Sequence, residues 1–273
     1  MRCIGLTLIG LTLSSLLLAK GTLAQFSVID ALLAGIYDGP TNIGELKAAG
    51  DTGLGTFNAL DGELVMLDGV VYQIAHEGEV HVMPDDAHTP FAVVCDFMPE
   101  MVFPLWPVDS FHAFEGRWTT LSAATDADYL YPPDPLSENQ FYAVKLEGKF
   151  TTIKARSVPR QSPPYRPLGE VVADQNIFNF AEIEGTMVGF YCPPYTRGVN
   201  VPGWHFHFIS QDRQFGGHVL DFSSTGLPGV TVAWQMLDKL SLRLPGDAVF
   251  ANVDLTPDRQ EDLDKVERLR TED

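Results

Sequence analysis

The stretch that decides the fold and the site is GVNVPGWHFHFISQDRQFGGHVLDF, residues 198–222. Within it, residues 204–208 alternate aromatic side chains with histidines in the order Trp-His-Phe-His-Phe. Successive side chains of a β-strand point to opposite faces of a sheet, so His205 and His207 share one face. The alternation therefore predicts a strand with one imidazole face and one aromatic face.

The residues that follow predict a hairpin that brings a third histidine to the same face. Segment 210–217 is polar and ends in two glycines, which is typical of a loop, and a second strand then spans residues 218–222. A loop centred near residue 212 places His218 directly opposite His207. A His-x-His pair alone is more often two half-buried rings than a ligand pair, but the third histidine favours metal binding. Three imidazoles and one open position are typical of a catalytic zinc site.

Two other segments predict hairpins that carry charged candidates. Residues 63–75 are two apolar runs joined by Asp-Gly, which predicts a hairpin with a two-residue turn and Glu63 at its mouth. Residues 141–156 predict another hairpin, with Glu147-Gly148 as its turn and Arg156 near the end of its second strand. By default, a charged residue at the end of a strand is expected to be exposed to solvent, and this applies to both Glu63 and Arg156.

Strands dominate the pattern, and the helical segments are few and short. The proline-rich segment 157–168 is the best candidate for a boundary between halves. We therefore expect an α+β chain of two packed β-rich halves, residues 25–160 and 161–273. The second half carries the histidine hairpin and ends in a charged helix or tail.

The N-terminus resembles a secretion signal. Arg2 precedes an apolar run over residues 4–19, and Ala24 ends a stretch of small residues that suits cleavage. We expect residues 1–24 to be removed and the mature chain to be secreted or periplasmic. No other stretch approaches the length of a membrane span, so stable membrane association is not expected after cleavage.

Composition restricts the partners. The chain has 18 basic and 36 acidic residues, a formal net charge of −18, which argues against nucleic acid and anionic membranes as partners. A negatively charged substrate would need a local positive feature such as a metal or an arginine. Cys95 and Cys192 could form a disulfide in an oxidising compartment or remain two buried thiols, and the sequence leaves both open.

Three blocks of the sequence closely resemble the α-acetolactate decarboxylases. They are GLGTFNALDGELVMLDGVVYQI at 53–74, FYAVKLEGKFTTIKARSVPRQSPPYRPL at 141–168, and GFYCPPYTRGVNVPGWHFHFISQDRQFGGHVLDF at 189–222. The third block is the most specific, and the resemblance extends from about residue 31 to residue 255. It implies a Zn²⁺ enzyme, a homodimer, that converts (S)-2-acetolactate (2-hydroxy-2-methyl-3-oxobutanoate) to (R)-acetoin and carbon dioxide.

The resemblance also implies roles for individual residues. It assigns the metal to His205, His207 and His218, a catalytic carboxylate near the metal to Glu63, substrate contacts to Thr56 and Arg156, and a second catalytic carboxylate in the C-terminal tail to Glu267. Glu261 and Asp264 remain open as alternatives for that last position.

The chemistry of decarboxylation explains why such residues are needed. Loss of carbon dioxide from a β-keto acid leaves an enediolate, whose negative charge a metal could stabilise as a Lewis acid. A guanidinium such as Arg156 could hold the departing carboxylate through both oxygens. A carboxylic acid of raised pKa, Glu63 or Glu267, could then protonate one face of the enediolate.

Two other classes of function remain open. A zinc hydratase of the carbonic anhydrase type also uses His-x-His with a third histidine on a neighbouring strand, although its third ligand normally lies farther along the chain. A secreted, non-catalytic metal-binding protein would also explain the signal and the acidic surface. Such a protein has no need of Arg156. The remaining histidines, at 76, 81, 88 and 112, are interpreted as surface or packing residues.

Overall fold

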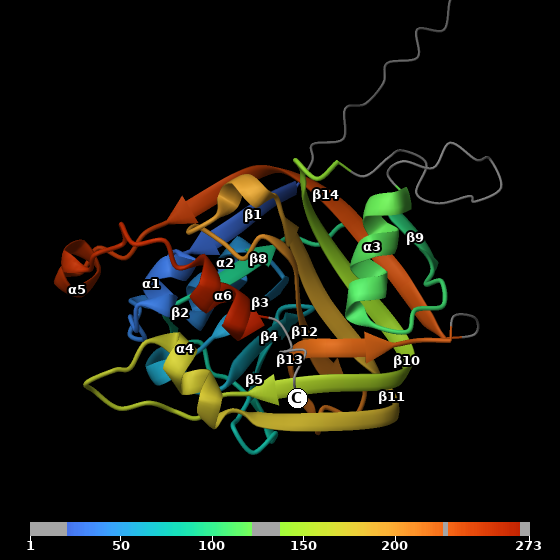
Figure 1. Cartoon of the computed structure of the whole chain (residues 1–273), viewed down its shortest axis with the longest axis horizontal. Helices are drawn as coiled ribbons and strands as arrows, with labels where there is room; N and C mark the ends of the chain where they lie inside the picture. The colour runs from blue at the N-terminus through green and yellow to red at the C-terminus, as the bar shows by residue number, and fades with distance from the viewer. Residues whose placement is uncertain (1–20, 122–136, 226–228, 268–273) are drawn as a thin grey trace, which may run out of the picture.

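The structure, a computed structural model, describes residues 21–121, 137–225 and 229–267. Strands dominate and the helices are few and short, which confirms the predicted α+β class (Figure 1). The strands are β1 (Gly21–Phe26), β2 (Thr41–Asn42), β3 (Thr52–Thr56), β4 (Glu63–Leu67), β5 (Val70–Ile74), β6 (Val80–Val82), β7 (His88–Thr89), β8 (Ala92–Cys95), β9 (Met101–Pro104), β10 (Phe141–Ser157), β11 (Asn176–Cys192), β12 (Gly203–Ser210), β13 (Gly216–Ser223) and β14 (Val230–Arg243). The helices are α1 (Ile29–Leu33), α2 (Ile43–Ala49), α3 (Phe111–Leu121), α4 (Leu168–Val171), α5 (Ala248–Asn252) and α6 (Gln260–Glu267), with short 3-10 turns at Asn58–Leu60, Val172–Asp174 and Pro194–Thr196.

Among the described residues, twelve of these strands form one continuous sheet. Its order is β11-β12-β13-β10-β14-β1-β8-β3-β4-β5-β6, and β9 pairs with β14 beside this path. β11 pairs with β10 as well as with β12, so β10 to β13 close into a ring. The sheet therefore runs without a break from the N-terminal strands into the ring that carries the histidines.

The predicted hairpin over residues 141–156 is wrong. β10 is one uninterrupted strand, which pairs with β14 over its first half and with β13 over its second. Gly148 permits close approach instead of a turn: its φ is +142°, and a Cβ there would lie 2.1 Å from the carbonyl oxygen of Gly229. Glycine tolerates that backbone conformation, so the residue that suggested a turn fits into a continuous ladder.

The hairpin of β12 and β13 confirms the predicted register. His207 lies directly opposite His218, and β12 pairs on its other side with β11. The aromatic face of β12 packs against α3, where Phe114 meets Phe206 edge to face with ring centroids 5.6 Å apart. Phe206 and Phe208 are fully buried, which stabilises the fold by about 1.5–3 kcal/mol per side chain. The opposite face carries the imidazoles toward β4.

β1 bears on the predicted processing of the chain. It pairs in parallel with β14 and antiparallel with β8, and Leu23 within it is fully buried. A cut after Ala24 would fall inside this strand and remove Leu23 from the core. Residues 1–20 of the expected signal lie outside the described residues, so the signal stays a prediction.

The predicted boundary at residues 160 and 161 also stays a prediction. β10 precedes this boundary, yet it pairs with β11, β13 and β14, which follow it. Among the described residues, no helix is long and apolar enough to cross a membrane.

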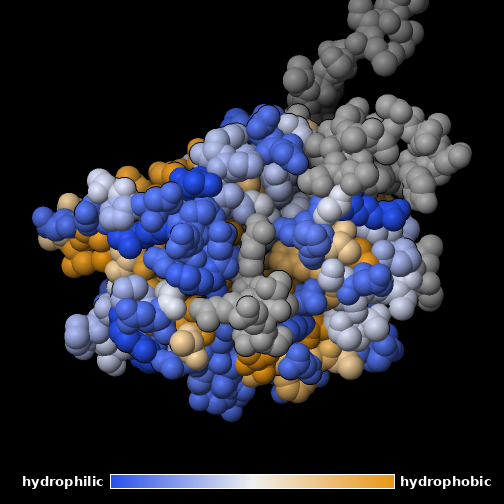
Figure 2. Space-filling view, in the orientation of Figure 1, coloured by the Kyte–Doolittle hydropathy of each residue, from blue (hydrophilic) through white to orange (hydrophobic). Residues whose placement is uncertain are grey.

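The two C-terminal helices differ in how they meet the body of the protein. α6 lies beside α4, over the ends of central strands (Figure 1), and its outer surface is hydrophilic (Figure 2). α5 stands away from the body and has no buried residue. Apolar side chains are exposed nearby, at Leu240, Leu242, Leu244 and Val249.

Candidate metal centre

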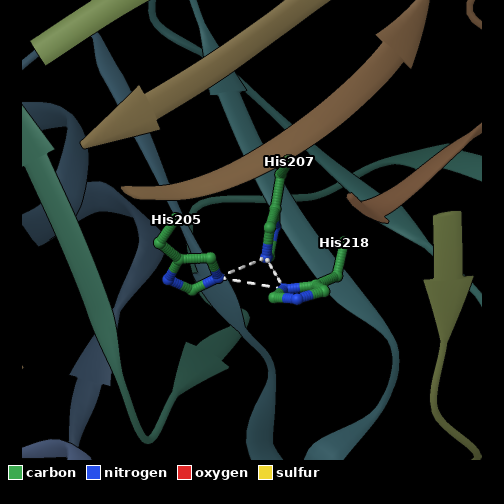
Figure 3. A group of neighbouring side chains, drawn as sticks. All are labelled: His205, His207 and His218. Atoms are coloured by element: carbon green, nitrogen blue, oxygen red, sulfur yellow. Dashed lines mark hydrogen bonds between the residues drawn. The ribbon is translucent and has the colours of Figure 1, made fainter. Parts of the chain in front are cut away.

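Three buried imidazoles converge on one point between β12 and β13 (Figure 3). The Nε2 atoms of His205 and His207 lie 3.1 Å apart, and Nδ1 of His218 lies 3.0 Å from the first and 3.3 Å from the second. His205 and His207 share a face because they are two residues apart on β12, and His218 joins them through the hairpin register. The sequence-predicted ligands are therefore brought together.

The protein fixes the tautomer of His207. Its Nδ1 lies 2.8 Å from the main-chain carbonyl oxygen of Leu64 on β4. A carbonyl oxygen only accepts hydrogen bonds, so Nδ1 donates and the lone pair of Nε2 points at the other two rings. This is the usual outer-shell arrangement of a metal-bound histidine.

The three rings are held neutral. Burial lowers the pKa of His205 to about 3, with the positive charge of Arg156 acting in the same direction. Burial also lowers the pKa values of His207 and His218 well below the usual histidine value. Metal ions bind the neutral imidazole, so the site is in its binding-competent form at neutral pH.

The geometry fits a tetrahedrally coordinated divalent metal ion such as zinc. Tetrahedral zinc with Zn–N bonds of about 2.0–2.1 Å sets its nitrogen ligands about 3.3 Å apart. The nitrogen–nitrogen distances in this cluster, 3.0 to 3.3 Å, are close to that spacing. The three ring nitrogens lie close enough together for one divalent ion to bind all of them.

A buried ion pair flanks the histidines. Nη1 of Arg156 donates to Oε1 of Glu63 at 3.3 Å, and Oε2 of Glu63 lies 3.6 Å from Nε2 of His207. Both side chains are almost fully buried. By default, the sequence suggested that Glu63 and Arg156 are exposed to solvent at the ends of their strands. Burial raises the pKa of Glu63 to about 7, opposed by Arg156 and reinforced by Glu267. A carboxyl group that titrates near neutrality can both hold and release a proton.

Local backbone geometry places Glu63 and Thr56 side by side. β3 and β4 pair so that Thr56 lies opposite Glu63, and the hydroxyl of Thr56 donates to the carbonyl oxygen of Gly62 at 2.7 Å. Gly62 has a φ of +79°, and a Cβ there would lie 2.2 Å from the carbonyl oxygen of Ile74. Glycine is therefore required at the turn that aims Glu63 inward.

The C-terminal helix supplies the second carboxylate. Oε2 of Glu267 lies 3.6 Å from Nε2 of His205 and 3.6 Å from Nε2 of His218. Of the alternatives, Glu261 is exposed, and Asp264 accepts a hydrogen bond from Gln260 and lines a separate, wider cavity. The structure therefore places Glu267, and neither alternative, beside the histidines.

These groups line a small cavity of about 30 Å³. Its polar wall consists of Thr56, Glu63, Arg156, His205, His207, His218 and Glu267. Its apolar wall comes from Ile29, Leu32, Leu60, Phe91, Val158, Leu168 and Val266. The polar and ionisable groups therefore converge on one side of the cavity and face buried apolar side chains on the other.

Sequence reasoning missed two main-chain groups. The carbonyl of Leu64 orients His207, and the carbonyl of Val266 accepts from Nη2 of Arg156 at 3.1 Å. Every residue has a main-chain carbonyl, so the residue pattern does not indicate which carbonyls will hydrogen-bond to the site. His81, His88 and His112 lie at exposed positions and do not join the cluster.

The fold and the site together define a strand-rich protein with one buried three-histidine centre of the kind that holds a catalytic metal. The profile of the family "Alpha-acetolactate decarboxylase" matches residues 23–257. The chain belongs to this family, which confirms the resemblance seen in the sequence.

Individual members of the family align with this chain over most of their length. An alpha-acetolactate decarboxylase from Methanosarcina mazei is 42% identical over 92% of this chain and 81% of its own. One from Methylococcus capsulatus is 42% identical over 89% of this chain and 87% of its own. The crystal structure of the alpha-acetolactate decarboxylase from Bacillus subtilis strain 168 matches with a TM-score of 0.82 and 34% identity, covering 91% of this chain and 100% of that one.

Proposed function

We propose that this protein decarboxylates (S)-2-acetolactate to (R)-acetoin and carbon dioxide, with Zn²⁺ held by His205, His207 and His218. One observation carries the proposal: in a member of this family, a single buried cavity joins three convergent imidazoles to a guanidinium and two carboxylates. When bound, zinc supplies Lewis-acid stabilisation of the negative charge that develops as carbon dioxide leaves.

Arg156 is the proposed holder of the substrate carboxylate. It stands on β10 directly opposite His218, so its guanidinium and the metal ligands are fixed by neighbouring strands of one ring. A guanidinium meets a carboxylate through two parallel hydrogen bonds, which holds the group until its carbon–carbon bond breaks. Glu63 keeps the guanidinium in place through the 3.3 Å contact.

Glu63 is the proposed proton donor to the enediolate. Its carboxyl group is buried and lies 3.6 Å from Nε2 of His207, and its raised pKa favours the protonated acid that a donor needs. Protonation from this fixed side would select the hand of the product. Thr56, directly opposite Glu63 on β3, would orient the substrate through its hydroxyl.

The apolar wall is suited to the methyl groups of the substrate. Ile29, Leu32 and Phe91 are buried side chains that exclude water from the cavity. Water exclusion strengthens the charge interactions on which the reaction depends.

The test is turnover by the purified protein together with an arginine variant. We expect the full-length protein to form acetoin and carbon dioxide from racemic 2-acetolactate, leaving the other enantiomer largely unused. Arg156→Lys keeps a positive charge but loses the bidentate fork, so it should keep its zinc and lose about 10²-fold or more in turnover. Carbon dioxide hydration without acetolactate turnover would instead favour a zinc hydratase.

Export and self-association are further proposals. We propose that the N-terminal segment directs secretion to the periplasm or medium, and that it is cleaved ahead of Gly21 so that β1 stays whole. N-terminal sequencing of the exported protein tests this, and a mature chain that begins at Gln25 would contradict it. The family resemblance supports a homodimer, which sedimentation equilibrium would detect.

A further inference from the structure

The hairpin that carries Glu63 is bound to the ring of strands through two main-chain carbonyls. Leu64 follows Glu63 in β4, and Ile74 on β5 lies directly opposite Glu63. Nδ1 of His207 on β12 donates to the carbonyl oxygen of Leu64 at 2.8 Å. The hydroxyl of Ser157 on β10 donates to the carbonyl oxygen of Ile74 at 2.9 Å. The two donors therefore hold the hairpin at the residue next to Glu63 and at the residue across from it.

Ser157 links β10 to this hairpin in the interior of the protein. Ser157 and Ile74 are both fully buried. Ser157 directly follows Arg156, whose Nη1 donates to Oε1 of Glu63 at 3.3 Å. Two adjacent residues of β10 thus contact the hairpin, one through an ion pair and the other through a neutral hydrogen bond. The distance between Arg156 and Glu63 therefore depends on how β10 and the hairpin are held together.

Two further contacts join the segment after Ser157 to the residues that precede the hairpin. Nη1 of Arg160 lies 2.6 Å from Oδ2 of Asp61, but the Arg160 side chain is 67% exposed, and exposed ion pairs contribute little. The main-chain amide of Gln161 donates to the carbonyl oxygen of Ala59, which lies farther from Glu63 along the chain. A buried hydrogen bond is stronger than an exposed one, and its loss leaves the acceptor unsatisfied. The Ser157 contact should therefore affect the position of the hairpin most.

The packing of Gly62 connects the carbonyl of Ile74 to the position of Glu63. A Cβ at Gly62 would lie 2.2 Å from the carbonyl oxygen of Ile74, so the backbone just before Glu63 packs directly on the group that Ser157 binds. Loss of the hydroxyl would leave this buried carbonyl without the donor, and a buried acceptor shifts toward any other donor within reach. A shift of the Ile74 carbonyl would change the turn at Gly62 and, with it, the direction of the Glu63 side chain.

We propose that Ser157 is a positioning residue, which holds Glu63 against Arg156 and beside His207 by binding the carbonyl of Ile74. The inference rests on the proposed function for the proton that Glu63 delivers to the enediolate. Its structural content, that the hydroxyl of Ser157 sets the placement of Glu63 on Arg156, does not. The hydroxyl would act through the hairpin and not on the substrate itself.

Removal of the hydroxyl tests the proposal through kinetics and product configuration. Ser157→Ala should lower kcat by about tenfold, because the proton donor is no longer held in its productive geometry. KM should change by less than about threefold, and the zinc content should be kept. Chiral gas chromatography should show a more mixed acetoin, because a displaced donor protonates the enediolate less selectively. Unchanged kcat together with an unchanged product configuration would overturn the proposal.

Ser210→Ala is the matched control. Ser210 is also buried, and its hydroxyl donates to Asp212 and accepts from the amides of Gln214 and Phe215. Its loss removes more hydrogen bonds than the loss of the Ser157 hydroxyl, but at a hairpin loop away from Glu63. The control should lower the free energy of unfolding and leave kcat and the product configuration unchanged. If it reproduced the kinetic effects of Ser157→Ala, those effects would reflect stability alone and the proposal would fail.

A double-mutant cycle tests the placement of Glu63 without turnover. Urea unfolding is measured for the full-length parent, Ser157→Ala, Glu63→Gln and the double variant. If Ser157 places Glu63 on Arg156, the two changes should be coupled by at least about fivefold in the unfolding equilibrium constant. The same cycle with Ser210→Ala should be multiplicative within about twofold. A Ser157 cycle that is also multiplicative would overturn the proposal.

A second variant keeps the proposal testable if Ser157→Ala does not fold. Ser157→Cys keeps the size of the side chain but offers only a weak donor, so it should lower kcat by about threefold and show coupling to Glu63→Gln in the same direction. Unchanged kcat and no coupling in this variant would overturn the proposal. If the parent makes no acetoin, the proposed function fails. The unfolding cycle still decides the inference in that case.

Discussion

The site is built from two kinds of support, paired strands and one small helix. The histidines, Arg156, Glu63 and Thr56 stand on β3, β4, β10, β12 and β13, whose registers are fixed by ladder hydrogen bonds. Glu267 stands on α6, which is anchored by Leu263 and Val266. Strand-borne groups are therefore held by ladder hydrogen bonds, whereas the helix-borne group is held in place by the packing of two buried side chains. The positions of the histidines therefore depend on the whole sheet, whereas the position of Glu267 depends on Leu263 and Val266.

The largest effect is expected at the strand-borne metal ligands. His207→Ala removes the ligand that Leu64 orients, so the protein should lose both bound zinc and at least about 10³-fold in turnover. Metal analysis and an acetoin assay on the same sample measure the two effects. His81→Ala, at an exposed histidine outside the cluster, is the control and should change neither. Full turnover by a zinc-free His207→Ala protein would rule out the proposed mechanism.

The next largest effect is expected for a Glu63 variant, which should lose proton transfer while it keeps metal binding. Glu63→Gln keeps the shape of the side chain but cannot donate an acid proton, so turnover should fall by about 10²–10⁴-fold while zinc content is kept. The loss should also appear as a mixed product configuration, measured by chiral gas chromatography, if water then supplies the proton. Unchanged turnover would remove Glu63 from the mechanism.

Glu267→Gln compares the carboxylate carried by α6 with Glu63, the carboxylate carried by a strand. The carboxylate of Glu267 lies 3.6 Å from Nε2 of both His205 and His218 and is the second candidate proton donor, so this variant should keep its zinc and lose about 10²-fold or less in turnover. The measurement is kcat beside that of Glu63→Gln under identical conditions. A loss as large as that of Glu63→Gln would show that the helix-borne carboxylate is the proton donor.

The last prediction concerns the free energy of unfolding and tests whether β10 is one continuous strand. Gly148→Ala places a Cβ against the carbonyl of Gly229 at an unfavourable φ, and should lower the free energy of unfolding by roughly 2–4 kcal/mol. Urea denaturation followed by circular dichroism measures it. Gly116→Ala, in α3 with open space around the position, is the control and should be neutral or slightly stabilising. Equal stability of the two variants would contradict the continuous β10.

The sequence predicts the metal hairpin well because its information is local. The alternation over residues 204–208 sets the shared face, and the loop length sets the pairing of His207 with His218, both within one stretch of chain. The Asp-Gly turn between β4 and β5 is predicted for the same reason.

The sequence predicts poorly where distant segments decide the structure. Glu147-Gly148 suggests a turn, but β11 and β14 on both sides keep β10 extended. Arg156 and Glu63 are buried because β4 and β10 lie close together in the fold. No local sequence pattern predicts this burial. The position of Glu267 depends on the packing of α6 onto α4, which the charged tail sequence does not show.

The central claim is that three strand-borne imidazoles bind one divalent metal on which decarboxylation depends. Metal analysis of the purified protein, followed by chelation and re-addition of zinc with acetoin measured at each step, tests it most directly. We predict one metal ion per chain, loss of acetoin formation on chelation, and recovery with one equivalent of zinc. Undiminished acetoin formation by the metal-free protein would contradict the account.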